Sequence, residues 1–234
     1  MPGSVALVGA GEFTPAMSEI DRALLASTGV ARPRVVVVPT ASWPDGDDVF
    51  RRWGALGQAH FEALGAEVEQ VLVRDRAEAD DPACAQAAGE ADLIYFSGGK
   101  PDHLRAVLDG SALWAAVLSA HERGAVLAGC SAGAMVLGGK QVEFRRRVGL
   151  PIRWAPALGV LPEIAVIPHY DRFPETLSAI FALRAPKGIA VLGIDEDTAV
   201  VSRDGVFEVQ GRTGVTIWRG RVRRRVQVGE TFSV

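Results

Sequence analysis

A serine stands between small residues in the pentapeptide Gly129-Cys130-Ser131-Ala132-Gly133. The pattern matches G-x-S-x-G, the sequence of a nucleophile elbow, in which a sharp turn from strand to helix lifts a serine hydroxyl above a sheet. The Ala132 N–H would open that helix, where it can donate to a developing oxyanion. The pentapeptide therefore predicts nucleophilic chemistry at Ser131; the alternative is a structural glycine-rich turn.

A serine nucleophile needs a base, and the chain has 4 histidines. His169 directly follows an apolar run and a proline, at the C-terminal end of an expected strand, where open α/β sheets place their sites. His60 and His121 lie in helical runs, and His103 follows a glycine pair on the N-terminal side of its own helix. We predict His169 as the base, with a packed loop histidine as the alternative.

An orienting carboxylate is available at the end of another apolar run, in Asp195, Glu196 and Asp197. Successive side chains alternate in direction along an extended chain, so the carboxylates need not point the same way. Spacing alone does not choose which of them would hold the imidazole.

A glycine pair, Gly98-Gly99, follows a third apolar run and permits close approach of a backbone N–H to a ligand. Lys100 stands just before a helix that begins at a proline, and it either attracts an anionic substrate group or is an ordinary solvated lysine. Cys130 competes with Ser131 as nucleophile. It flanks the centre of the elbow, however, so its side chain is expected in the core.

The elements that would position these residues alternate along the chain. Short β-branched runs predict strands, and the stretches between them predict helices, which together indicate a mostly parallel sheet covered by helices. The expected strands are residues 5–8, 35–38, 68–73, 93–96, 125–128, 160–167 and 189–194, and the expected helices are 17–27, 49–64, 82–88, 102–108, 112–123 and 174–183. From about residue 198 to 234, short runs separated by turn residues predict a β-meander. We therefore predict one three-layer αβα sandwich over residues 1–234 with a C-terminal β-meander.

Composition excludes several other classes of protein. The 234 residues are 48% hydrophobic and 23% charged with a net charge of −3, so no basic field draws the chain to nucleic acid or an anionic membrane. The arginine clusters 145–147 and 219–225 lack interleaved aromatic residues and are expected on solvated surfaces. Neither cysteine has a zinc-type spacing, and residues 9–14 fail the dinucleotide fingerprint. We expect a cytoplasmic protein with no metal, no cofactor, no signal peptide and no membrane span.

Taken in order, these motifs resemble those of the dipeptidase E and cyanophycinase family of serine peptidases. The similarity rests on YFSGG at 95–99, GCSAGA at 129–134, PH at 168–169 and GIDEDTA at 193–199, and it extends from residue 7 to residue 216. The resemblance implies a sandwich like that of class I glutamine amidotransferases, with serine in place of cysteine, and a reaction that needs no cofactor.

The resemblance also assigns roles to individual residues. Ser131 matches the nucleophile, His169 the general base, and Gly99 and Ala132 the backbone donors of the oxyanion hole. Glu196 matches the acidic member in the cyanophycinase branch. The dipeptidase E branch instead takes an aspartate between the serine and the histidine, and the corresponding stretch of this chain contains none.

The substrate is where the chain departs from cyanophycinases, which carry acidic and amide residues just before the histidine and arginines after it. Here Ile167 and Pro168 precede the histidine, and Pro168-His169-Tyr170 is similar to the dipeptidase E branch, which cleaves after an N-terminal aspartate. We therefore expect a dipeptidase- or aminopeptidase-like enzyme that hydrolyses short peptides.

Three further residues near the predicted site, Lys100, Tyr170 and Arg172, are candidate substrate contacts. Because members of the family are often dimeric, a homodimer is also expected. Two alternatives to a peptidase remain: an esterase or another acyl hydrolase with the same machinery, and a non-catalytic ligand-binding protein on the same scaffold.

Overall fold

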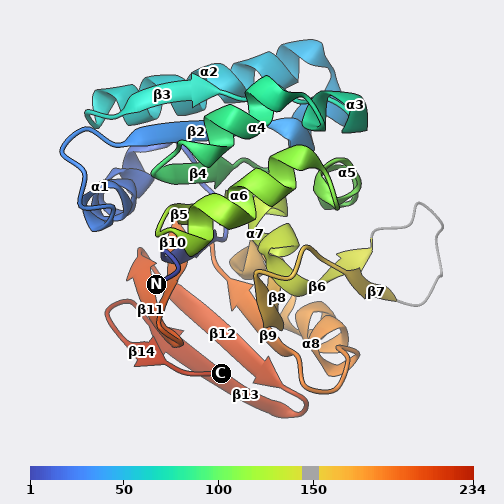
Figure 1. The fold of residues 1–234 in the computed structure, drawn as a ribbon. Helices are drawn as coiled ribbons and strands as arrows, with labels where there is room; N and C mark the ends of the chain where they lie inside the picture. The colour runs from blue at the N-terminus through green and yellow to red at the C-terminus, as the bar shows by residue number, and fades with distance from the viewer. Residues whose placement is uncertain (144–152) are drawn as a thin grey trace.

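The computed structural model describes residues 1–143 and 153–234, whose strands form two sheets (Figure 1). The strands of the larger sheet are β1 (Val5–Val8), β2 (Arg34–Val38), β3 (Glu67–Gln70), β4 (Leu93–Phe96), β5 (Val126–Cys130), β10 (Thr198–Arg203), β11 (Val206–Gly211) and β14 (Thr231–Phe232). They lie in the order β14-β11-β10-β1-β5-β4-β2-β3. From β1 to β3 all neighbours are parallel, and β10, β11 and β14 add antiparallel strands beyond β1. The mostly parallel sheet predicted from the β-branched runs is confirmed.

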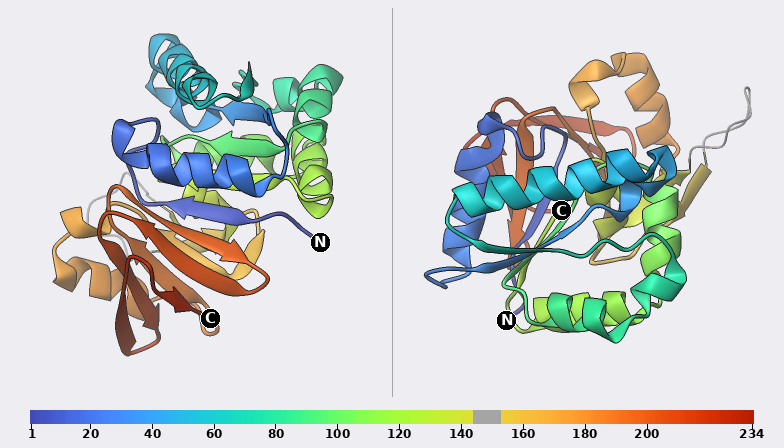
Figure 2. Two further views of the ribbon diagram at one scale, coloured as in Figure 1. Left: turned by 90° about the vertical axis from the view of Figure 1, so that its left-hand side faces the viewer. Right: turned by 90° about the horizontal axis from the view of Figure 1, so that it is seen from above.

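Helices cover both faces of the parallel part of this sheet, and Figure 2 shows α1 and α6 on opposite sides of the strands. The α-helices are α1 (Ser18–Ser27), α2 (Asp47–Ala63), α3 (Arg76–Ala79), α4 (Pro82–Gly89), α5 (Pro101–Leu108), α6 (Ala112–Glu122), α7 (Ala132–Leu137) and α8 (Glu175–Leu183), and the 3₁₀ turns are η1 (Pro15–Met17), η2 (Thr40–Asp45) and η3 (Tyr170–Arg172). In β2, Val35 and Val37 enter the core beneath α1 and α2, whereas Val36 and Val38 enter the core beneath α5 and α6. Successive strand residues point to opposite faces, which explains why this strand is an unbroken run of valines.

The smaller sheet is formed by β6 (Gly138–Glu143), β7 (Arg153–Pro156), β8 (Leu161–Ile167), β9 (Ala190–Ile194), β12 (Gly214–Arg219) and β13 (Val222–Gln227). Its order is β13-β12-β9-β8-β6-β7, with β6, β8 and β9 parallel. One face contributes to a cluster with residues of α8, and the other shares the core of β1 and α7. The C-terminal segment is all-β as expected, and its hairpins divide between the sheets: β10, β11 and β14 join the larger one, β12 and β13 the smaller.

Two short strands, β6 and β7, have no counterpart in the sequence prediction, and β3 ends at Gln70 rather than at residue 73. The arginine cluster 145–147, expected on a solvated surface, lies outside the described residues. Within the part of the chain that the structure describes, no helix has the length and apolarity needed to span a membrane.

Candidate active site

Ser131 occupies a sharp turn between β5 and α7. Its backbone has φ 49° and ψ −106°, a strained conformation typical of a nucleophile elbow. The Ser131 N–H donates to the carbonyl of Val8 in β1 at 3.0 Å, which ties the turn to the central strand. A Cβ on Gly129 would overlap the backbone of Gly133, and a Cβ on Gly133 would overlap the carbonyl of Phe96. The two glycines are therefore needed because α7 packs directly against both β5, which precedes it, and β4.

The Ser131 hydroxyl lies beside the imidazole of His169, with 3.1 Å between Oγ and Nε2. The other ring nitrogen of His169, Nδ1, lies 3.0 Å from Oε1 of Glu196. These residues follow β5, β8 and β9 respectively, so the larger sheet supplies the serine and the smaller sheet supplies the histidine and the carboxylate. The structure thus brings together the three side chains that the sequence predicted as nucleophile, base and acid.

His169 reaches the serine because the chain turns abruptly after β8. Pro168 ends the extended run, and His169 adopts left-handed backbone angles of φ 50° and ψ 37°. The carbonyl of His169 then accepts a hydrogen bond from the Arg172 N–H at 2.9 Å. This turn directs the chain into η3 and leaves the imidazole facing Ser131.

The three consecutive acids, which spacing could not separate, have different partners. Asp195 is buried, and both of its carboxylate oxygens accept from the Arg225 guanidinium. Asp197 has a left-handed φ of 54° and pairs with Arg212 at 3.3 Å. Only Glu196, among these three, contacts the imidazole. The alternation expected along the strand end therefore leaves Glu196 as the carboxylate facing the site.

Two neighbours fix Glu196 in place. The Arg172 guanidinium donates to Oε2 at 2.7 Å, and Asp171 accepts the Glu196 backbone N–H at 2.9 Å. The hydrogen bond from Arg172, and after it the one from His169, lowers the pKa of Glu196 below its usual range. A charged Glu196 can accept a hydrogen bond from Nδ1 of His169 and so orient the ring, as the carboxylate does in a catalytic triad.

The glycine loop after β4 is held on both sides of Gly99. The Gly98 N–H donates to Oε1 of Glu12 at 2.8 Å, and the Lys100 N–H donates to the carbonyl of Ala41 at 2.7 Å. Gly99 itself has a φ of 142°, where a Cβ would overlap Ala41. Its N–H has no acceptor among the described residues, and Gly99 lines the cavity in front of Ser131.

The first backbone N–H of α7 is a second hydrogen-bond donor beside the cavity, in addition to the N–H of Gly99. Ala132 begins α7 and also lines the cavity, and the first N–H groups of a helix have no intrahelical acceptor. The backbone donors predicted for an oxyanion hole, Gly99 and Ala132, therefore lie on the same cavity as the Ser131 hydroxyl.

Glu12 is a site residue that the sequence analysis did not single out. Its carboxylate is 8% exposed and accepts both the Gly98 N–H and the Cys130 thiol, whose Sγ lies 2.8 Å from Oε2. Burial raises the pKa of Cys130 well above its ordinary value, so a thiolate is disfavoured there. Cys130 is fully buried, as predicted, and its side chain points away from the cavity into the core beneath α1.

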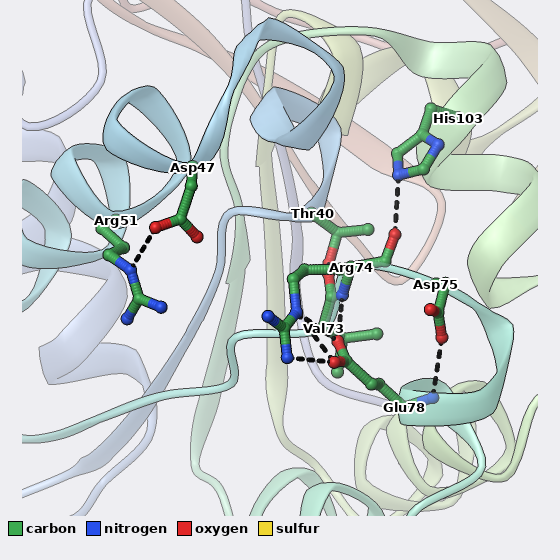
Figure 3. A network of polar contacts seen from close by, with 8 residues as sticks. All are labelled: Thr40, Asp47, Arg51, Val73, Arg74, Asp75, Glu78 and His103. Atoms are coloured by element: carbon green, nitrogen blue, oxygen red, sulfur yellow. Dashed lines mark hydrogen bonds and ion pairs between the residues drawn. The ribbon is translucent and has the colours of Figure 1, made fainter.

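The other histidines have structural partners instead. His60 lies 2.8 Å from the buried carboxylate of Asp21, and His121 caps the carbonyl of Ala125 at 3.0 Å. Figure 3 shows His103 directed at the carbonyl of Arg74, 3.0 Å away, within a polar network that does not include Ser131. None of these three rings contacts the serine.

A cavity of about 560 Å³ opens in front of Ser131 and His169. Of the predicted substrate contacts, Lys100 lines it, but the Lys100 ammonium pairs with Asp45 at 3.0 Å. Arg172 is engaged with Glu196. Tyr170 lies elsewhere, because its ring is 7% exposed and its hydroxyl accepts from the Trp218 indole at 3.0 Å. The structure therefore places Tyr170 in the core of the smaller sheet rather than on the cavity.

A strained serine at a strand-to-helix turn, bonded through a histidine to a carboxylate on a layered α/β scaffold, defines a serine hydrolase. Comparison with known proteins narrows that class. The chain belongs to peptidase family S51, whose family model matches residues 5–210, and it is therefore a peptidase, as the motifs predicted.

Relatives with curated names include cyanophycinases. One from Trichormus variabilis is 29% identical over 227 residues, which cover 92% of this chain and 72% of the relative. Another from Synechococcus elongatus is 34% identical over 194 residues, covering 77% of this chain and 57% of the relative.

Solved structures agree on the fold. A peptidase from an acI-B1 actinobacterium superposes with a TM-score of 0.90 and 33% identity, covering 100% of this chain and 98% of the other. A peptidase E protein from Listeria monocytogenes superposes with a TM-score of 0.62 over 97% of this chain and 100% of the other. At 18% identity the second structure bears on the fold alone.

Proposed function

We propose that the protein hydrolyses short peptides through a Ser131–His169–Glu196 triad. The observation that supports this most directly is the continuous hydrogen-bonded chain from the Ser131 hydroxyl through both nitrogens of His169 to Glu196, with steps of 3.1 and 3.0 Å. Distances of this size are within reach for proton transfer between nucleophile and base.

In the first half of the reaction, Ser131 Oγ attacks the scissile carbonyl while His169 Nε2 takes the hydroxyl proton. The carbonyl oxygen becomes an oxyanion, which accepts hydrogen bonds from the N–H groups of Gly99 and Ala132. The C–N bond then breaks, and His169 gives its proton to the leaving amine. The products of this half are an amine and an acyl group esterified to Ser131.

In the second half, water replaces the amine. His169 takes a proton from the water as the water attacks the ester, and then returns it to Ser131 Oγ as the C–O bond breaks. Glu196 stays charged throughout and stabilises the imidazolium in both halves. The proton that Ser131 loses leaves with the amine, and water supplies both the proton that restores Ser131 and the oxygen that completes the new carboxylate.

The test is a defined mixture of di- to pentapeptides incubated with wild-type protein and with the Ser131→Ala variant, with products identified by mass spectrometry. The mixture includes peptides with N-terminal aspartate and a β-linked aspartyl-arginine. Cleavage by wild type alone is expected. Equal cleavage by Ser131→Ala would contradict the proposal, as would the absence of cleavage of every peptide by wild type.

A further inference from the structure

The walls of the cavity in front of the triad are largely apolar. Several segments contribute apolar side chains to it, among them Met135 in α7, Val142 in β6, Val166 in β8, and Phe173, Leu177 and Phe181 in or just before α8. The volume of about 560 Å³ is in the range of small-molecule sites. A dipeptide with an aromatic or branched apolar side chain is a ligand of matching size.

The apolar wall formed by α8 is incompletely covered by the rest of the described chain. Phe173 is 41% exposed and Leu177 is 38% exposed, although both line the cavity. Apolar side chains left open at the rim of an enzyme cavity mark a surface that a ligand covers. The ligand group that gains most from contact with such a wall is itself apolar.

The charged groups of the cavity disfavour an acidic side chain. Asp102 lines the cavity and is held by a hydrogen bond from Gln141 Nε2 at 2.8 Å. The one lysine among the described lining residues, Lys100, pairs with Asp45. No arginine stands among the described residues of the lining. A carboxylate brought into this cavity would meet Asp102 and would have to compete with Asp45 for Lys100.

We infer that the residue next to the scissile bond carries a large apolar side chain, which enters the cavity between α7, β8 and α8. The inference rests on the proposed peptidase function and names its substrate class. It departs from cleavage after an N-terminal aspartate, the specificity that the similarity to the dipeptidase E branch implied.

The first experiment compares dipeptides that differ in one side chain. The set is X-Ala and Ala-X, with X being leucine, phenylalanine, aspartate or lysine, and the readout is kcat/KM. Burying a leucine or phenylalanine side chain should raise kcat/KM by about 10- to 100-fold over aspartate in at least one of the two series. Equal values for leucine and aspartate in both series would overturn the inference.

A matched pair of variants on α8 localises the effect. Leu177→Asp places a charge on the cavity wall, whereas Ile180→Asp makes the same change on the same helix at a residue that is 45% exposed and does not line the cavity. The preference for leucine over aspartate should fall about tenfold or more in Leu177→Asp and stay unchanged in Ile180→Asp. Equal preferences in the two variants would overturn the inference.

Binding to the Ser131→Ala variant separates this inference from the proposed function. Calorimetry with Leu-Ala, Ala-Leu and their aspartate counterparts requires no turnover, and the apolar dipeptides should bind about tenfold tighter or better. If wild type cleaves no peptide but this preference holds, the proposed function fails and the apolar site stands. If peptides are cleaved but the preference is missing, the inference fails and the proposed function stands.

Discussion

The Arg172 guanidinium donates to Oε2 of Glu196 at 2.7 Å, whereas Oε1 of the same carboxylate faces Nδ1 of His169. Both carboxylate oxygens of Glu196 therefore have a partner: Arg172 on one and His169 on the other. The hydrogen bond from Arg172, and after it the one from His169, lowers the pKa of Glu196, and the two contacts together fix the orientation of the carboxylate.

The lowered pKa has a defined consequence for stability as a function of pH. Because Glu196 titrates at lower pH in the folded chain than in the unfolded one, its stabilisation is fully present above the unfolded value of about 4.3. It is lost as pH falls through the folded pKa. In Arg172→Gln this pKa should return towards the ordinary range, which moves the loss to higher pH.

The measurement is the unfolding midpoint of wild type and Arg172→Gln across an acidic pH series. The two midpoints should differ near neutral pH and converge at low pH, where Glu196 is protonated in both proteins. Arg212→Gln, which removes an exposed arginine paired with the neighbouring Asp197, is the control. A difference that stays constant down to the lowest pH would show that the contact with Glu196 is not the cause.

The choice of Glu196 among three acids predicts a large and selective loss of rate. Glu196→Gln retains the shape of the side chain but removes the charge and favours the wrong imidazole tautomer. We therefore expect kcat to fall by about 10³- to 10⁴-fold. Asp197→Asn changes the next acid in the same way and should leave kcat within a few-fold of wild type. Comparable losses in the two variants would remove the special role of Glu196.

Glu12 should support catalysis through the backbone of Gly98 rather than by contact with substrate. Glu12→Ala removes the buried acceptor of the Gly98 N–H, so the adjacent Gly99 donor should shift and kcat should fall by about tenfold or more with little change in KM. Glu12→Gln retains an acceptor oxygen and should recover most of the rate. An equal loss in both variants, or a loss confined to KM, would contradict this positioning role.

The buried thiol of Cys130, next to the proposed nucleophile Ser131, should have no part in the reaction. Burial and the contact with Glu12 disfavour the Cys130 thiolate, so Cys130→Ala should retain kcat within a few-fold of wild type. Iodoacetamide should modify Cys130 only after unfolding, as mapped by peptide mass spectrometry. Rapid modification in the native protein, with loss of activity, would make Cys130 the competing nucleophile.

The proposed nucleophile and base could be predicted from sequence because their signals are local. The elbow pentapeptide contains its own turn residues, and His169 follows an apolar strand run and a proline. The orienting carboxylate was harder to predict, because the local sequence does not show in which direction the side chains of Asp195, Glu196 and Asp197 point. Resemblance favoured Glu196, and the tertiary partners of its two neighbours explain why it alone of the three faces the imidazole.

Residues whose roles depend on distant partners were missed or misplaced. Glu12 is separated by 86 residues from the Gly98 N–H that it binds, and nothing in its immediate sequence indicates that contact. Tyr170 stands next to the predicted base, yet a hydrogen bond from Trp218, 48 residues further along the chain, holds it in the core. The two-sheet arrangement was likewise beyond local patterns, because hairpin signals do not tell which sheet a hairpin joins.

The most direct test of the triad is covalent labelling of the native protein with a fluorophosphonate, which reacts with an activated serine. We predict one adduct per chain in the intact mass, mapped to Ser131, with labelling lost in Ser131→Ala and strongly slowed in His169→Ala. Labelling at another residue, or equal rates in wild type and His169→Ala, would contradict the account of Ser131 as a nucleophile activated by His169.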